Sequence, residues 1–585
     1  MKTWLQIGSI RGLLGVALFM PCALPLHAQD HGSDHGAAPP VIDETVPAES
    51  NNYPLGPDSQ VHTAVAAGQT FKFDLKDSKI FPGTSRTITV YIPAEYQGDK
   101  PACVYVGLDG LGFNATTVFD NLIAQHAMPV TIAIGVSPGV VASANAPDNP
   151  RFDRSFEFDS RSDRLARFLL EEVLPAVEQY PTAEGRPLKL STNPDDRAIG
   201  GGSTGAIAAF TVAWQRPDAF RRVFSAIGTY VGMRGGEQYY VLVRKTEPKP
   251  LRIFMEDGVH DEWPGGPEMG DWWMSNQTMN RALTFAGYDV RHVWGAGTHN
   301  GSQAASVFPD AMRWLWRDWP APIPAGSPGN PVLKAILQPG ETWQVAAENC
   351  SVVGKLAANP KGQVFSQVGT QGNPALCGQP ASAASFAFGA DGKIYPAGAP
   401  KLAALHIRNL IVRSNGDMYA VTQRNELWLI RAHGEKIRLD QGLKGASGIA
   451  LSPDGLWLFV AQSLSRTGLS YRVQSDGTLD ARSPFYDFYV PTWADDSGAA
   501  GIGMDKEGRA YVATRMGVQV FDRNGRVAAI LPLPGNMAAT GLCFGGHDFD
   551  TLYVAGGGKV YRRKLHAVGA APWAAPAQLP PWGAG

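Results

Sequence analysis

One segment, residues 197–214 (RAIGGGSTGAIAAFTVAW), constrains the fold of this 585-residue chain more than any other. Its first residues are typical of a strand, Gly201 to Gly205 form a tight turn, and the apolar run that follows is typical of a helix. Glycine on both sides of Ser203 permits a strained turn that lifts the hydroxyl group above the end of the strand. The segment therefore predicts a strand, a sharp turn and a helix in direct succession.

Strand-like and helix-like segments alternate around this unit, from about residue 59 to residue 320. The strand-like segments are short and apolar, and they lie at residues 87–93, 102–110, 130–136, 251–257 and 289–297. Apolar residues recur at helical spacing at residues 162–180, 274–287 and 305–319. This alternation predicts a mostly parallel sheet covered on both faces, that is, an α/β domain over residues 59–320.

A different kind of sequence follows a linker rich in Pro and Gly, which we place at residues 321–338. A turn of Asp, Asn and Gly type then precedes an apolar strand six times, at residues 359–368, 389–398, 413–422, 452–461, 505–514 and 547–556. Recurring strands that each carry a turn signature are typical of propeller blades. We predict a β-propeller over residues 339–575, with six blades give or take one.

The N-terminus has the features of a removable leader. Lys2 and Arg11 carry positive charge, residues 12–19 are apolar, and Leu26 to Ala28 offers a cleavage site. We expect residues 1–28 to be a signal peptide, residues 29–58 to be a linker, and the protein to be periplasmic or secreted. No later segment is apolar over the roughly 18–20 residues that a spanning helix needs, so we expect no membrane span in the mature chain.

Charge and cysteine content narrow the class of protein further. The formal net charge of −2 lacks the basic surplus of a nucleic-acid-binding protein, so we expect no nucleic-acid partner. Removal of the leader takes Cys22 and leaves Cys103, Cys350, Cys377 and Cys543. In an oxidising compartment Cys350 and Cys377 can pair across a short loop. Free buried thiols are the alternative, because connectivity does not follow from sequence.

Ser203 has the setting of a nucleophile, and its partners should follow in the order serine, acid, histidine. His299 lies in a loop of small residues (GAGTHNGS) after a strand and before a helix, which suits an imidazole that must reach the serine. His292 lies within the strand and is interpreted as a packing residue. We therefore predict Ser203 as nucleophile and His299 as base.

The acid should come from the loop after the strand at residues 251–257, where the candidates are Glu256, Asp257, Asp261 and Glu262. Asp261 is favoured because it lies beyond Gly258, far enough along the loop to turn back toward the base, and Asp257 is the main alternative. The role of the acid would be to hold the imidazole tautomer and to stabilise the imidazolium.

Two further groups complete the predicted site. Backbone N–H donors for a developing oxyanion are expected at Thr204 and at either Gly110 or Leu111. Several aromatic residues are candidates for contacts with an aromatic acyl group or a sugar ring, with ordinary packing as the alternative: Phe113, Tyr230, Trp263, Trp272 and Trp273.

Residues from about 70 to 320 resemble the esterase D family of α/β-hydrolases, which includes enterochelin (siderophore) esterases and feruloyl or acetyl-xylan esterases. The resemblance rests on YVGLDGLGF (105–113), RSFEFDSRSDRLARFLLEEVLP (154–175), IGGGSTGAIAAF (199–210), EDGVHDE (256–262) and GAGTHNGS (295–302). It implies an α/β-hydrolase fold, a serine esterase activity, and an acid in a Gly-x-x-Asp arrangement that maps to Gly258 and Asp261. Ala206 departs from the family, in which a second glycine is usual.

Residues from about 340 to 570 resemble the gluconolactonase (senescence marker, regucalcin-like) propellers, most clearly at residues 447–461 and 495–521. Those propellers bind a divalent metal through Glu, Asn and Asp side chains, at positions that map to Gly354, Arg408, Ser447 and Ala500 in this chain. Only Ser447 offers a side-chain oxygen, and a weak one for a hard cation. The resemblance therefore implies a propeller that has lost its metal, and we expect no cofactor; a glycan or a protein partner is a possible ligand.

Together these features predict an exported serine carboxylic ester hydrolase that acts on carbohydrate-linked or aromatic esters of the feruloyl or acetyl type. Three alternatives stay open. They are a siderophore trilactone esterase with the same catalytic residues, a lactonase on the propeller, and a two-domain binding protein without activity.

Overall fold

The computed structural model describes residues 46–145, 148–180, 188–350, 355–368, 374–377, 385–395, 402 and 404–580. The predicted signal peptide and residues 29–45 of the predicted linker lie outside the described residues. Among the described residues, no helix combines the length and the apolar character needed to cross a membrane.

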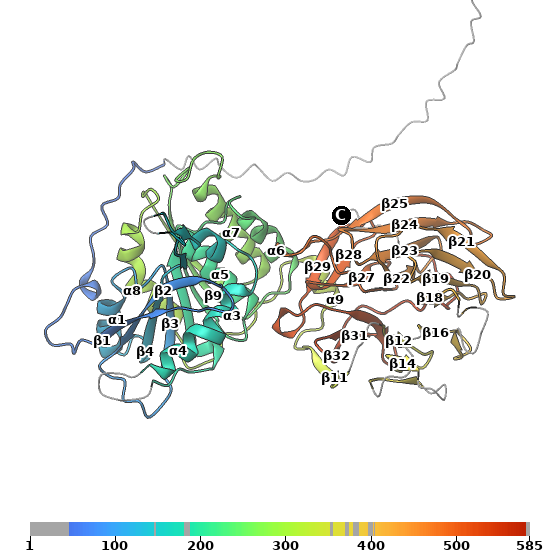
Figure 1. Ribbon diagram of the computed structural model, residues 1–585, viewed down its shortest axis with the longest axis horizontal. Coiled ribbons are helices and arrows are strands. Elements are labelled where there is room, and N and C mark those ends of the chain that lie inside the picture. The colour runs from blue at the N-terminus through green and yellow to red at the C-terminus, as the bar shows by residue number, and fades with distance from the viewer. Residues whose placement is uncertain are drawn as a thin grey trace, which may run out of the picture. The chain divides into compact units, whose positions relative to one another are not determined.

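A ten-stranded sheet has the order β10-β9-β8-β7-β3-β4-β2-β5-β6, with β1 paired to β2. Its strands form the centre of the α/β region, with helices around them (Figure 1). The strands from β10 to β4 pair in parallel, and β2 joins β4 antiparallel. Their bounds are β1 Gln69–Leu75, β2 Thr84–Ile92, β3 Cys103–Leu108, β4 Thr131–Val136, β5 Val140–Val141, β6 Arg151–Phe152, β7 Arg197–Gly202, β8 Arg222–Ala226, β9 Arg252–Gly258 and β10 Asp289–Gly295. The predicted, mostly parallel sheet is confirmed.

Helices cover both faces of this sheet. Phe119 of α1 and Phe308 of α8 belong to one apolar cluster, and Phe168 of α3, Phe210 of α5 and Met279 of α7 belong to another. The helix bounds are α1 Ala115–Ala124, α2 Arg154–Phe158, α3 Arg164–Phe168, α4 Leu174–Gln179, α5 Thr204–Gln215, α6 Tyr239–Lys245, α7 Trp272–Ala286, α8 Ser302–Trp316 and α9 Pro331–Ile336. A π-helical turn, Leu169–Val173, joins α3 to α4, so the helix predicted over residues 162–180 is continuous with one widened turn. Helix α9 lies inside the predicted linker at residues 321–338.

The second region consists of antiparallel sheets, four of which have four strands in the described residues: β18-β19-β20-β21, β22-β23-β24-β25, β26-β27-β28-β29 and β11-β32-β31-β30. Their bounds are β11 Gln344–Ala347, β18 Ile407–Val412, β19 Met418–Thr422, β20 Leu427–Ile430, β21 Lys436–Asp440, β22 Ala446–Leu451, β23 Trp457–Gln462, β24 Thr467–Val473, β25 Leu479–Asp487, β26 Gly501–Met504, β27 Ala510–Thr514, β28 Gly517–Phe521, β29 Val527–Leu531, β30 Gly541–Gly545, β31 Thr551–Gly556 and β32 Lys559–Lys564. Because β11 pairs with β32, the start and the end of this region share one sheet.

The remaining described strands form three short pairs: β12 Ala357–Ala358 with β13 Val364–Phe365, β14 Gln367–Val368 with β15 Pro374–Ala375, and β16 Ala387–Phe388 with β17 Ile394–Tyr395. The described residues therefore contain four four-stranded sheets and not the six that the repeats predict, because the first two repeats form only two-stranded hairpins. Each of the six predicted turn–strand units nevertheless supplies a second strand, namely β13, β17, β19, β23, β27 and β31. The first strands contact one another in succession, from β30 through β12, β16, β18, β22 and β26 back to β30, which is a propeller-like ring.

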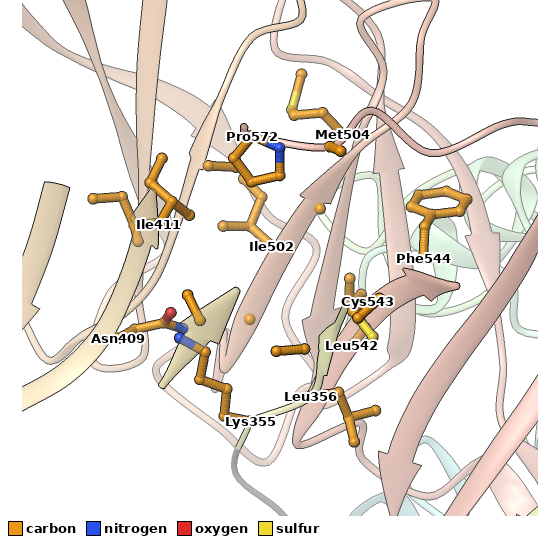
Figure 2. A pocket seen from close by; sticks show the side chains of 18 of the residues that line it. Lys355, Leu356, Asn409, Ile411, Ile502, Met504, Leu542, Cys543, Phe544 and Pro572 are labelled. Atoms are coloured by element: carbon orange, nitrogen blue, oxygen red, sulfur yellow. The ribbon is translucent and has the colours of Figure 1, made fainter. Parts of the chain in front are cut away.

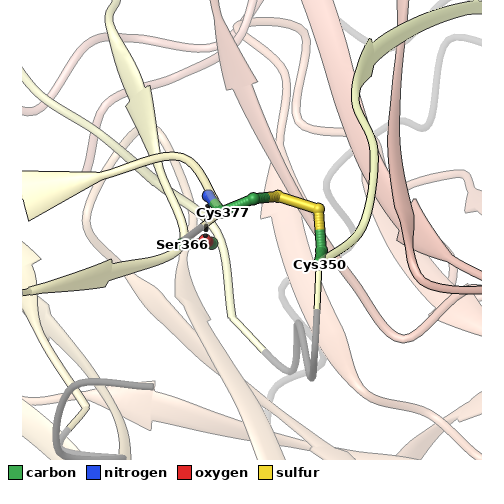
Figure 3. Close-up of a disulfide and its surroundings, with 3 residues drawn as sticks. All are labelled: Cys350, Ser366 and Cys377. Atoms are coloured by element: carbon green, nitrogen blue, oxygen red, sulfur yellow. Dashed lines mark hydrogen bonds between the residues drawn. A yellow bond between two sulfur atoms is a disulfide. The ribbon is translucent and has the colours of Figure 1, made fainter. Parts of the chain in front are cut away.

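A disulfide joins Cys350 to Cys377, 27 residues apart, with 4.9 Å between their Cα atoms (Figure 3). The backbone N–H of Cys377 donates to Ser366 Oγ at 3.0 Å. The sequence left open whether Cys350 and Cys377 form a disulfide or remain free thiols, and the structure contains the disulfide. Among the described residues, Cys103 and Cys543 are free thiols.

Candidate active site

Ser203 occupies the sharp turn between β7 and α5. Its φ of 56° and ψ of −122° lie outside the regions that a residue with a side chain ordinarily adopts. A Cβ atom on Gly201 would lie 2.7 Å from the carbonyl carbon of Gly205, so the turn requires glycine at that position. The N–H of Ser203 donates to Ala226 O at 2.9 Å, which fixes the turn to the neighbouring strand β8. The hydroxyl is therefore presented at the carboxyl edge of the parallel sheet.

A continuous line of hydrogen bonds runs from Ser203 through His299 to Asp261. His299 Nε2 lies 2.9 Å from Ser203 Oγ, and His299 Nδ1 lies 2.9 and 2.8 Å from the two carboxylate oxygens of Asp261. Because a carboxylate only accepts, Nδ1–H donates to Asp261, and Nε2 is left to accept from the serine hydroxyl. The His299 side chain is 23% exposed and that of Asp261 is fully buried, so the serine end of the line is the end open to solvent.

Two adjacent strands bring His299 and Asp261 together. β9 and β10 pair in parallel with Gly258 opposite Gly295, and the loops after them run side by side. Val259 N–H donates to Gly295 O at 2.9 Å, and His260 N–H donates to Gly297 O at 3.0 Å. A Cβ atom on Gly258 would collide with the carbonyl oxygen of Gly297, so glycine permits this close approach.

Three carboxyl groups gather at the end of β9, and their environments differ. Burial and the Asp261 charge raise the pKa of Glu256 to about 8. Burial also raises the pKa of Asp257 well above its ordinary value, and the charge and hydrogen bond of Asp261 act in the same direction. Asp257 Oδ1 accepts from Gly258 N–H at 2.8 Å. Of the four candidate acids, Asp261 is thus the one bonded to His299, Glu256 and Asp257 favour the neutral form, and Glu262 is exposed.

The predicted oxyanion donors lie at the same edge of the sheet. β3 and β7 are parallel neighbours, so the turn after β3 and the turn at Ser203 emerge together. Asp109 and Gly110 both have positive φ, 65° and 99°, and the Asp109 carboxylate accepts two hydrogen bonds from Arg154 at 2.8 and 2.7 Å. Within the described residues, no backbone carbonyl accepts from the N–H groups of Thr204 or Leu111. Both groups therefore remain available to a substrate oxygen.

Two of the predicted substrate contacts are buried. Tyr230 has no exposed surface, and its hydroxyl lies 3.0 Å from Ser225 Oγ, so this ring belongs to the core and has no face for a substrate. Trp272 is 2% exposed and packs edge-on against the His299 ring at 5.6 Å between centroids. Its Nε1–H donates to Thr229 Oγ1 at 3.1 Å. Trp272 thus supports the imidazole rather than an open binding surface.

The other three aromatic residues keep accessible surface. Trp263 is 54% exposed. Phe113 is half-buried, and its ring lies close to Gly202 and Gly301, between the turn of Ser203 and the loop of His299. Trp273 is half-buried and packs edge-on against Trp294 at 5.3 Å. These three residues are the predicted aromatic contacts that the structure leaves open to a ligand.

A segment assigned to the linker by sequence contributes to the site. Ser50 N–H donates to Ala296 O at 2.9 Å, and Tyr53 Oη accepts from Ala296 N–H at 2.7 Å. Asn51 Oδ1 accepts from Thr298 N–H at 2.9 Å, and its amide donates to Thr298 Oγ1 at 3.0 Å. Residues 50–53 therefore fix the backbone immediately before His299. No hydrophobic period marks them, so the sequence offers no signal for this contact.

The propeller positions that correspond to metal ligands in gluconolactonases do not supply a ligand set. Gly354 lies outside the described residues. Arg408 donates to Ala446 O, the Ser447 hydroxyl donates to Ala461 O and Ala499 O, and Ala500 offers only a methyl group. A divalent cation needs several anionic or carbonyl oxygens, so the described residues at these positions do not fit one.

Comparison with known families connects these observations to two families. Residues 78–390, more than half of the chain, match the family described as "Putative esterase". The chain belongs to this esterase family. The esterase is accordingly a carboxylic ester hydrolase, and its residues 389–557 match the "SMP-30/Gluconolactonase/LRE-like region". The two matches agree with the resemblance of the sequence to esterases and to gluconolactonase propellers.

Solved structures similar to this esterase include members of both groups. A ferulic acid esterase is 16% identical, with 43% of this chain and 99% of that chain covered and a TM-score of 0.33. The enterochelin esterase from Shigella flexneri is 17% identical, with 43% and 59% covered and a TM-score of 0.32. A gluconolactonase from Xanthomonas campestris is 17% identical, with 40% and 93% covered and a TM-score of 0.32.

Proposed function

We propose that this esterase hydrolyses its ester through Ser203, with His299 as general base and Asp261 as the group that orients it. The observation that carries the proposal is the unbroken line of hydrogen bonds from the serine hydroxyl to the buried carboxylate. Ser203 Oγ attacks the carbonyl carbon while His299 Nε2 takes the hydroxyl proton, and His299 then gives this proton to the leaving alcohol. Water then attacks the acyl carbon while His299 Nε2 takes one of its protons, and the bond to Ser203 breaks as His299 returns that proton to Ser203 Oγ, which releases the acid.

The N–H groups of Thr204 and Leu111 are the proposed donors to the oxyanion. Both belong to turns at the carboxyl edge of adjacent strands, and neither has a backbone acceptor within the described part of the chain. Removal of one such donor from a serine hydrolase typically lowers kcat by about 10²–10³. Gly110 is the second candidate for the donor from the β3 turn.

The proposed substrate is a carbohydrate-linked or aromatic ester of the feruloyl or acetyl type. Three accessible aromatic rings, Phe113, Trp263 and Trp273, support it because such rings stack on aromatic and sugar faces. A panel of methyl ferulate, acetylated xylan and ferric enterobactin tests the choice. Turnover of ferric enterobactin at a kcat/KM above that of the other two would replace this substrate class with a siderophore trilactone.

The catalytic assignment is tested by covalent labelling. A fluorophosphonate probe is expected to modify Ser203 and no other serine, as read by peptide mapping, and Ser203→Ala is expected to abolish both labelling and turnover. The Ser143→Ala variant, which removes a serine from another loop, serves as the matched control. A folded protein that is not labelled would instead support a binding protein, and lactonase turnover that survives Ser203→Ala would support activity on the propeller.

We further propose that the esterase is exported and that its second region is a six-bladed propeller. The Cys350–Cys377 disulfide supports export, since disulfides persist in oxidising compartments. The succession of six first strands that returns to its start supports six blades. Mass spectrometry of the protein recovered outside the cytoplasm tests export, with a new N-terminus at Gln29 expected and an intact Met1 contradicting it.

A further inference from the structure

The centre of the propeller-like ring contains a cavity of about 120 Å³. The first strand of every sheet in the ring lines it, namely β12, β16, β18, β22, β26 and β30. A cavity of about 150 Å³ with apolar walls accommodates one benzene molecule, so this volume suits a single ring or a short chain.

Most of the side chains that line this cavity are apolar. Figure 2 shows the apolar side chains, which include Leu356, Ile411, Ile502, Leu542, Phe544 and Pro572. The polar side chains labelled in the same view are Lys355, Asn409 and Cys543. Among the described residues that line the cavity, Lys355 is the one charged side chain.

Lys355 has no anionic partner among these lining residues. Its Nζ donates to Leu410 O at 3.1 Å and to Ser385 Oγ at 3.4 Å, and both acceptors are neutral. An ammonium in apolar surroundings is costly without a counter-ion. The cavity therefore combines an apolar volume with a cation whose charge no lining carboxylate balances.

We propose that this cavity is a binding site for a small monocarboxylate with an apolar body, whose carboxylate pairs with Lys355 Nζ. The apolar body fills the space between Ile411, Ile502 and Leu542. A divalent cation does not suit the cavity, because Lys355 repels it and Ala500 offers it no oxygen. If the ligand is the acid that ester cleavage releases, that identity rests on the proposed function. The binding site itself does not depend on the proposed function.

The protonation of Lys355 gives the site a pH dependence. Burial lowers the pKa of Lys355 to about 7, so the empty site holds a growing fraction of neutral amine as the pH rises above 7. Among the described residues, Cys543 is the titratable neighbour that acts on Lys355, and burial raises the pKa of its thiol. Carboxylate binding requires the ammonium, so the affinity is expected to fall up to tenfold per pH unit above pH 7.

The test uses the full-length Ser203→Ala protein, which removes ester hydrolysis without touching the cavity. Calorimetric titration at pH 6.5 compares benzoate with its neutral isostere benzamide. Benzoate is expected to bind saturably and at least tenfold more tightly than benzamide, and Lys355→Met is expected to remove this preference. Lys361→Met, which changes an exposed lysine of the same segment, is the matched control and should leave it unchanged.

A second variant keeps the proposal testable if Lys355→Met does not fold. Ile502→Phe fills the cavity and is expected to abolish benzoate binding while the circular dichroism spectrum stays that of the parent protein. Equal binding of benzoate and benzamide, or benzoate binding that survives Lys355→Met or Ile502→Phe, would overturn the proposal. Because Ser203 is absent throughout, a negative result here leaves the esterase mechanism untouched.

Discussion

Asp257 lies near the end of β9 and Asp261 lies four residues further along, in the loop that follows, and the surroundings of the two carboxyl groups differ. Both Asp261 oxygens lie within 2.9 Å of His299 Nδ1, and its side chain is fully buried, so water cannot replace it. Burial, the Asp261 charge and a side-chain hydrogen bond with Asp261 raise the pKa of Asp257, which favours a neutral carboxyl group that donates to Asp261. In the Asp261→Asn variant the Asp257 carboxyl group donates to the new amide oxygen, so the amide NH₂ faces His299 Nδ1. His299 Nδ1 must then accept a hydrogen bond, which places the imidazole proton on Nε2, where the proton of Ser203 should be received.

The expected loss for Asp261→Asn is therefore large. A carboxylate-to-amide change at this place in a serine hydrolase lowers kcat about 10⁴-fold, which is a rise of about 5 kcal/mol in the barrier. In Asp257→Asn the amide NH₂ takes over from the acid proton and the amide oxygen still accepts from Gly258 N–H, so kcat should stay within about tenfold of the parent value.

Burst and steady-state hydrolysis of p-nitrophenyl acetate by both variants measures the difference. The fluorophosphonate labelling rate provides an independent readout of the serine alone, and circular dichroism checks that each variant folds. The reasoning is refuted if Asp257→Asn loses as much kcat as Asp261→Asn, because Asp257 would then be the acid. A loss of less than about 30-fold in Asp261→Asn would equally contradict it.

Three further predictions concern the surroundings of the site and the second region. Tyr53→Phe leaves the N–H of Ala296 unpaired and is expected to lower kcat about 5–10-fold with little change in KM. The control variant Tyr180→Phe should have no effect, and an unchanged kcat in Tyr53→Phe would show that residues 50–53 do not position the base. Burial raises the pKa of Glu256 from its ordinary value of 4.5 to about 8 in the folded chain, so the folded state holds this proton more tightly than the unfolded state does. The free energy of unfolding should therefore fall by up to about 1.4 kcal/mol per pH unit between pH 4.5 and 8. Urea unfolding at pH 5 and pH 7 should show a smaller fall in Glu256→Gln than in the parent protein, and an equal fall would refute the assignment. Cys350→Ser opens a loop of 27 residues and is expected to lower the free energy of unfolding by about 3–4 kcal/mol, an effect that reductant should reproduce in the parent protein and not in the variant.

The parts of the site that the sequence predicts are those dictated by local pattern. The glycines around Ser203 leave few conformations other than a sharp turn, and a loop of small residues after a strand places His299 at the carboxyl edge of a parallel sheet. Spacing alone did not separate Asp261 from Asp257. Burial and the direction of each side chain separate them, and both depend on how the loops after β9 and β10 pack.

Other features depend on contacts between distant residues, which no local pattern records. Asn51 and Tyr53 bond to backbone groups more than 240 residues away, so the sequence presents them as part of a polar linker. Tyr230 follows a strand that ends at the site, yet its ring turns into the core. The number of four-stranded sheets differs from the predicted blade count because the strands near Asn359 and Asp391 form only two-stranded pairs among the described residues.

The two regions differ in the residues that gather at their candidate sites. In the esterase region Ser203, His299 and Asp261 meet at one edge of the sheet, as the resemblance to the esterase D family implies. In the propeller-like ring, the central cavity is lined by Ala500, Gly501 and Lys355, and the resemblance to gluconolactonases maps a metal ligand to Ala500. Under the proposal above, the described lining residues offer one amine and no carboxylate, which favours anions over cations. A ligand search on the second region should therefore start from small carboxylates, because the shape of the ring alone would direct it to metal ions and lactones.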